Sequence, residues 1–184
     1  MSEQAGRYQR STAGLIGAIL ITLVAIGGFV VFRSLVRDEV QQEPEAIDYL
    51  ESAGFAQDAG AEIAYPRSVP DGWSATSVDY QPGDPPAWGV GFLTDETLFV
   101  GVRDEDASLD DLLETYVEPD ENDIEQLADQ GLDSEVASTW QVFEDSGDDR
   151  AYAAEVGDRL VLVYGSAPSE DLELVVEQLT TQPR

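Results

Sequence analysis

The sequence predicts an α+β fold with an antiparallel sheet, preceded by one N-terminal transmembrane helix, and three observations lead to this class. The run from Ser11 to Phe32 carries no charged residue, and a helix of about 20 such residues crosses a hydrocarbon core of about 30 Å. After residue 60, several short runs alternate apolar and polar residues, which is typical of strands. Other segments place apolar residues three or four positions apart, which indicates helices packed on the sheet.

The chain divides into four segments in this interpretation. We assign residues 1–12 to a cytoplasmic tail, 13–32 to the transmembrane helix, 33–60 to an acidic juxtamembrane spacer with room for a short helix, and 61–184 to an extracytoplasmic α+β domain. A signal peptide has an apolar region of about 7–15 residues and a small-x-small cleavage site. The apolar run here is longer and no such site follows it, so we expect a retained, single-pass anchor.

The arginines beside the span do not orient it. Arg7 and Arg10 precede the span, and Arg33 and Arg37 follow it, so the positive-inside rule gives no preference. The free amino terminus favours a cytoplasmic N-terminus with the domain outside the cell membrane. Small residues also recur every four positions within the span, a spacing that lets two helices approach closely. A homodimer through the transmembrane helix therefore stays open, although such residues are common in spans.

The first half of the domain reads as a turn, three strands and two helices. Two prolines and the Asp71-Gly72 pair mark a rigid segment that ends in a turn. Alternation assigns one strand face to Thr76, Val78 and Tyr80, another to Trp88, Val90 and Phe92, and a third strand to residues 98–102. Ser108 is the expected N-cap of a helix with Leu109, Leu112, Leu113 and Tyr116 on its apolar side. Ile124 and Leu127 mark a second short helix that ends at Gly131.

The second half repeats part of this order. Strands are expected over residues 136–142 and 152–156, joined by a loop at 146–149, and over 160–164, which is apolar on both faces and therefore central. A closing helix begins near Ser169 and places Leu172, Val175, Val176 and Leu179 on one face. Residues 88–116 and 152–179 both read as hairpin, acidic linker and helix. We therefore expect two β-β-α-like units on a shared antiparallel sheet with packed helices.

The composition excludes several classes of function. Residues 38–184 hold 37 acidic and 5 basic residues, and a field of this sign repels phosphate groups, so we expect no nucleic acid partner. The chain has no histidine, cysteine or lysine. This excludes Ser-His-Asp and Cys-His catalysis, disulfides, the usual structural zinc sites and Schiff-base chemistry. Solubility and adaptation to high salt both explain the acidity, and the sequence does not choose between them.

Three acidic clusters are the candidate cation sites. Oxygen ligands alternate from Asp104 through Asp106 to Ser108, and again at Glu118, Asp120 and Asn122, but the glycine and glutamate of a calcium-binding loop are missing. The third cluster comprises Glu144, Asp145, Asp148 and Asp149. Such spacings arise by chance in so acidic a chain. We therefore assign no catalytic, cofactor-binding or metal-binding residue and expect no cofactor.

The three tryptophans could form a platform for a carbohydrate or a peptide. Trp73, Trp88 and Trp140 each lie in or beside an apolar alternating run, which is where core aromatic residues occur. We therefore expect them in the core.

Three stretches carry a family resemblance. They are Pro70-Asp71-Gly72-Trp73 with the following Ser-Ala-Thr-Ser, Trp88-Gly-Val-Gly-Phe-Leu-Thr94, and Val163-Tyr-Gly-Ser-Ala167. With these the chain resembles an actinobacterial family of single-pass membrane proteins catalogued only as a domain of unknown function. The resemblance implies an N-inside anchor and an extracytoplasmic domain, and it supplies no activity or ligand. The extreme acidity departs from the family.

These observations predict a non-enzymatic, membrane-anchored binding or accessory protein of the bacterial cell envelope. Its expected partners are the membrane, as an integral single-pass protein, and an envelope protein. The alternative is a carboxylate-dependent hydrolase that acts on cell-wall polymer, for which two carboxylates must face each other across a cleft. A sensor would have to signal through another protein, because a tail of about a dozen residues cannot fold alone.

Overall fold

The computed structural model describes residues 46–118, 120 and 123–184. The predicted transmembrane helix at 13–32, the tail at 1–12 and the first part of the spacer lie outside these residues. Within the described part, no helix combines the length and apolar character that crossing a membrane requires.

Eight strands of the described chain form one main sheet, which is antiparallel throughout. Its order runs β2 (Ser74–Gln81), β3 (Ala87–Leu93), β4 (Phe99–Glu105), β9 (Arg159–Gly165), β8 (Arg150–Val156), β7 (Thr139–Asp145) and β5 (Ile124–Gln126), and β6 (Gln130–Gly131) also pairs with β7. Strand β9 lies between β4 and β8, as the doubly apolar run at 160–164 predicts. A separate pair, β1 (Tyr65–Pro66) and β10 (Leu179–Thr180), joins the segment after the first helix to the end of the last one.

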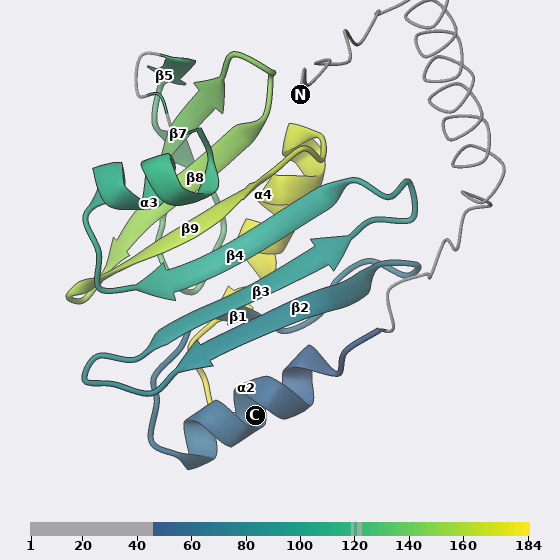
Figure 1. Ribbon diagram of the computed structural model, residues 1–184, viewed down its shortest axis with the longest axis vertical. Helices are drawn as coiled ribbons and strands as arrows, with labels where there is room; N and C mark the ends of the chain where they lie inside the picture. The colour runs from purple at the N-terminus through teal and green to yellow at the C-terminus, as the bar shows by residue number, and fades with distance from the viewer. Residues whose placement is uncertain (1–45, 119, 121–122) are drawn as a thin grey trace, which may run out of the picture. The chain divides into compact units, whose positions relative to one another are not determined.

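Helices cover both faces of this twisted sheet. Helices α2 (Tyr49–Asp58) and α4 (Ser169–Gln178) pack on one face, and α3 (Leu109–Tyr116) packs on the other. Figure 1 shows α3 in front of β9 and α4 behind it. The protein is therefore an α+β domain with a mostly antiparallel sheet and three helices among its described residues.

The larger core lies between the sheet and the α2–α4 face. Alternate residues of the central strands point into it because side chains along a strand alternate between faces. They include Trp88, Val90 and Phe92 of β3, Val100 and Val102 of β4, Tyr152 and Ala154 of β8, and Val161 and Val163 of β9. The intervening residues of β8 and β9 form a smaller core under α3, with Leu112 and Leu113 from the helix. These strand faces are the ones that the alternation predicts.

Two β-hairpins are each followed by a helix, in the order that the sequence predicts. The β3–β4 hairpin leads to α3 and the β8–β9 hairpin leads to α4, and the hairpins meet where β4 pairs with β9. However, α3 and α4 lie on opposite faces. A twofold axis perpendicular to the sheet would exchange the two hairpins and place both helices on the same face. The two units are therefore not related by such an axis.

Helix α2 extends the packed domain toward the N-terminus. The sequence interpretation placed residues 33–60 in a spacer outside the domain. In the structure, Tyr49, Ala53 and Ala56 of α2 are buried, and the Tyr49 ring meets Phe92 edge-on at 5.0 Å. Asp48 caps the helix by accepting a hydrogen bond from the Glu51 amide. The packed part of the chain therefore begins before residue 61.

The predicted second helix around Ile124 and Leu127 is wrong. Residues 124–126 form β5 and residues 130–131 form β6, and both strands pair with β7. The backbone amide of Leu127 also donates to the carbonyl of Val142. The open edge of β7 supplies hydrogen-bond partners to this segment, and tertiary pairing outweighs an apolar spacing that suits one helical turn.

A smaller correction concerns β2. A β-bulge between Ala75 and Ser77 shifts the register, so Ala75, rather than Thr76, is buried on the same side as Val78 and Tyr80.

Glycine at position 72 allows the turn that precedes β2. The Trp73 amide donates to the Pro70 carbonyl, and Gly72 has φ +91°, a conformation that costs other residues about 1–2 kcal/mol. We expect Gly72→Ala to lower the free energy of unfolding by about that amount. The matched control is Gly54→Ala in α2, where an added Cβ meets nothing within 4 Å. This substitution should raise the free energy of unfolding by about 0.5–1 kcal/mol. Urea denaturation of both variants measures these changes in the free energy of unfolding. Equal effects of the two substitutions would contradict the role of Gly72 in the turn.

Candidate functional site

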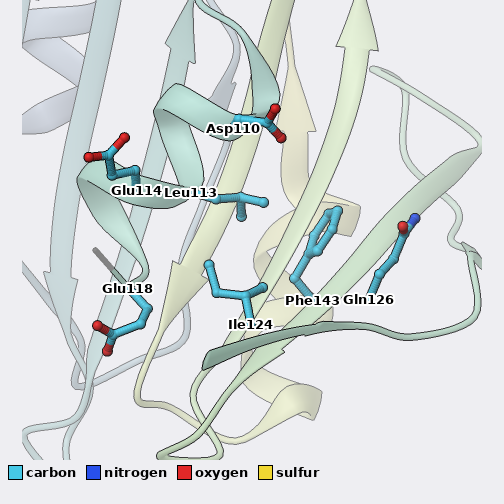
Figure 2. A pocket seen from close by; sticks show the side chains of 7 residues that line it. All are labelled: Asp110, Leu113, Glu114, Glu118, Ile124, Gln126 and Phe143. Carbon is cyan, nitrogen blue, oxygen red and sulfur yellow. The ribbon is translucent and has the colours of Figure 1, made fainter. Parts of the chain in front are cut away.

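A groove of about 290 Å³ lies between α3 and the strands β5 and β7. Figure 2 shows Leu113, Ile124 and Phe143 pointing toward one another as an apolar floor, each from a different element. The other lining residues are Asp110, Glu114, Glu118 and Gln126. We call this feature the α3 groove.

Local structure explains why these side chains meet. Ser108 caps α3 by accepting a hydrogen bond from the Asp111 amide at 3.1 Å, and the helix buries Leu112 and Leu113 on the sheet. On β5, Ile124 and Gln126 share a face because they are two residues apart. Phe143 of β7 lies opposite Gln126 in the strand register. The groove therefore depends on β5 being a strand.

The rim of the α3 groove is negatively charged. Asp110 and Glu114 lie one helical turn apart on α3, and Glu118 follows two residues after the helix ends. Figure 2 shows the carboxylates of Glu114 and Glu118 on the outer side of the groove. Among the described residues, Arg67, Arg103, Arg150 and Arg159 form ion pairs elsewhere, and no arginine pairs with these three carboxylates. The groove therefore presents an apolar floor beside uncompensated negative charge.

A buried ion pair between Asp104 and Arg159 lies on the α2–α4 face of the sheet, opposite the α3 groove. Asp104 is 0 % exposed and Arg159 is 8 % exposed. Oδ2 of Asp104 accepts hydrogen bonds from Nη1 of Arg159 at 2.7 Å and from the Ala64 amide at 2.6 Å. Arg159 also donates to the Glu62 carbonyl. The pair therefore joins β4, β9 and the segment that follows α2.

Burial raises the pKa of Asp104 to about 6, against the lowering effects of the Ala64 amide and Arg159. The raised value follows because burial disfavours the charged carboxylate. The folded protein then binds this proton more tightly than the unfolded chain does. The contribution of Asp104 to stability is therefore greatest below the ordinary carboxyl pKa and is lost as the pH rises through about 6.

We expect this sign in a stability–pH curve. The urea midpoint of the native chain should rise more than that of Asp104→Asn as the pH falls from about 7.5 to 5, because only the native chain takes up the extra proton. The difference between the two curves removes the general relief of acidic repulsion, which both proteins share. Parallel curves would contradict the raised pKa of Asp104.

An arginine–aromatic cluster lies on the α3 face of β4 and β9. The Arg103 guanidinium lies 4.4 Å from the centre of the Tyr116 ring and pairs with Asp79. The Tyr116 hydroxyl donates to Glu105 at 2.7 Å. A Cβ at Gly101 would lie 2.5 Å from the Tyr164 ring, so the glycine lets that ring lie flat on the sheet. These contacts hold the C-terminal end of α3 against the sheet through Tyr116.

Several members of the acidic clusters that the sequence suggests make structural contacts. Asp104 is buried, Glu105 faces Tyr116, and Ser108 caps α3. Asp145 accepts hydrogen bonds from the amides of Gly147 and Asp149 at the hairpin, while Glu144 pairs with Arg150. Asn122 lies outside the described residues. No group of three or more acidic side chains in the described part of the chain is arranged to hold a metal ion.

The tryptophans occupy the core rather than a surface platform. Trp88 and Trp140 are fully buried, and Trp73 is partly buried against the same core. The prediction of core positions is confirmed for Trp88 and Trp140.

Nearly the whole chain matches one protein family. The model of a family described as a protein of unknown function, DUF4245, matches residues 7–179. The chain belongs to the DUF4245 family. The matched region contains the α3 groove, the buried Asp104–Arg159 pair and the Pro70–Trp73 turn. No curated protein matches the chain, so the function of this DUF4245 member has to be argued from its own residues.

Proposed function

We propose that this DUF4245 protein is a membrane-anchored, extracytoplasmic binding protein of the cell envelope, and that the α3 groove is its binding site. The observation that carries the proposal is the combination of an apolar floor and a charged rim in one groove of about 290 Å³. Sites for ligands are mostly apolar concavities with a few polar groups that orient the ligand. A groove of this size accommodates a few side chains of a partner. The charge-free span at 13–32 would hold the domain at the membrane.

Binding is favoured over hydrolysis by where the carboxylates lie. The three carboxylates of the groove belong to α3 and the residues just after it, whereas the opposite side presents Ile124, Gln126 and Phe143. Two carboxylates therefore do not face each other across the groove, as a glycosidase requires. The carboxyl groups with raised pKa values, Asp104 and Asp149, are not among the residues that line it.

Site-specific photo-crosslinking tests the binding site. A photoreactive amino acid would replace Gln126 in the full chain, expressed in cells of the source organism. Gln81, an exposed glutamine on the opposite edge strand, gives the matched control position. We expect a crosslinked partner at position 126 and none at position 81. Adducts that are absent at both positions, or equal at both, would contradict the proposal.

Protease treatment of intact cells tests the proposed orientation. An extracytoplasmic domain should be degraded without lysis, while a cytoplasmic reporter protein survives. Degradation that requires lysis would place the domain on the cytoplasmic side.

A further inference from the structure

We infer that the α3 groove binds a peptide segment of a partner protein in which basic residues flank a bulky apolar side chain. This inference rests on the proposed function, because it names the chemistry of the partner at the same site. Three features carry it: the apolar floor, the charge of the rim, and the strand edge beside the groove.

The floor selects an apolar side chain. Leu113, Ile124 and Phe143 converge from α3, β5 and β7 (Figure 2), and the sheet and helix already hold Leu113 and Phe143 in place. A leucine, isoleucine, methionine or aromatic side chain inserted there would leave water for an apolar surface. A wholly polar ligand would gain nothing from this floor.

The rim selects positive charge. Asp110 and Glu114 are four residues apart on α3, which separates them by about 6 Å along the helix axis. Glu118 continues the acidic rim beyond the end of the helix. The long stems of arginine and lysine would let their charged ends reach this rim while the residue between them enters the floor. The overall acidity of the domain would also speed the approach of such a partner.

The strand edge favours a peptide over a small organic cation. Strand β5 is the last strand on the path of the main sheet, so within the described residues its outer backbone groups have no neighbouring strand. An exposed strand edge is a surface on which an extended peptide forms backbone hydrogen bonds. The exposed Gln126 amide beside it adds a donor and an acceptor. The carboxylates of Glu114 and Glu118 are spread along the rim and point outward, so they do not converge on a single ion.

A peptide array tests the chemistry of the partner. The full chain in detergent micelles would be applied to an array of random heptapeptides, and the strongest binder would be titrated by fluorescence anisotropy. We expect strong binders to carry arginine or lysine beside a large apolar residue. Glu114→Gln and Glu118→Gln should each weaken binding of the titrated peptide about two- to five-fold, the range for exposed ion pairs.

Matched controls separate the groove from the general acidity of the domain. Glu125→Gln removes the same charge from the face of β5 turned away from Ile124, and Glu177→Gln removes it from the exposed side of α4. Neither control should change the affinity. Ile124→Ser, with its fold checked by urea denaturation, should weaken binding by removing part of the floor.

The outcomes distinguish this inference from the proposed function. Strong binders without basic residues, or affinities that the rim variants leave unchanged, would overturn the inference. If the photoreactive residue at position 126 still formed an adduct with a peptide that lacks basic residues, the groove would remain the binding site. An array without binders, together with no adduct at position 126, would overturn both.

Discussion

Replacing Arg159 with methionine should lower the free energy of unfolding by about 3–5 kcal/mol, the usual cost of leaving one member of a buried ion pair alone. Asp104 would lose the guanidinium that donates to it at 2.7 Å, and the Glu62 carbonyl would lose a donor. Removing Arg159 also removes an influence that lowers the pKa of Asp104, so this carboxyl should take up a proton at higher pH. Urea denaturation of the full chain in micelles, followed by tryptophan fluorescence, measures the loss.

Two controls identify the pair as the cause. The exposed pair of Arg67 and Glu135, whose side chains are 49 % and 43 % exposed, should contribute far less to stability because water screens exposed charges, as Arg67→Met would measure. The double variant Asp104→Leu/Arg159→Met leaves no charge buried and should be less destabilised than Arg159→Met alone. If Arg159→Met and Arg67→Met lost the same stability, the buried pair would not have the role described above.

Replacing Trp140 with alanine should cost about 3–5 kcal/mol of unfolding free energy. Trp140 of β7 is 0 % exposed, and its indole Nε1 donates to the Ala137 carbonyl at 3.1 Å. The variant would leave a cavity in the larger core and an acceptor without its donor. Urea denaturation followed by circular dichroism gives the value without depending on the deleted fluorophore.

Trp73 provides the comparison for this prediction. It is partly buried at the periphery of the same core, so Trp73→Ala should cost clearly less than Trp140→Ala. Equal losses, or a larger loss at position 73, would contradict the burial that distinguishes the two residues.

Strand faces and helix caps could be predicted because their signals are local. The alternation of Trp88, Val90 and Phe92 predicts one buried strand face, and the structure buries all three. Ser108 predicts the start of α3 because a serine side chain satisfies a free amide in the first turn, and Ser108 does so for Asp111. These features depend on residues that are neighbours in the chain.

The packing of helix α2 on the domain and the formation of strand β5 could not be predicted because both depend on distant residues. The core side of α2 is built partly from Ala53 and Ala56, small residues that mark no clear apolar face. Strand β5 has three residues, and its structure comes from pairing Ile124 with Asp145 and Gln126 with Phe143. An isolated strand of this length is not stable, so β5 forms because it pairs with the edge of β7.

The candidate site was missed for the same reason. The groove combines residues of α3, β5 and β7, and the sequence places one of these elements in the wrong class. For Asp104 a signal was present: it follows Val100 and Val102 at the next inward position of β4. A carboxylate at an inward position is expected to pair with a cation, because burying an unpaired charge is costly. Only the fold shows that Arg159 is this cation.

Hydrogen exchange of the full chain, measured with and without the strongest basic peptide from the array, tests the α3 groove most directly. Bound peptide should slow exchange in α3 and β5, at residues 109–116 and 124–126, because it would cover that helix and pair with that strand edge. Exchange in α2, α4 and the β2 edge should stay the same. Protection confined to the β2 edge or to α4, or no change in α3 and β5 at saturating peptide, would contradict the proposed binding site.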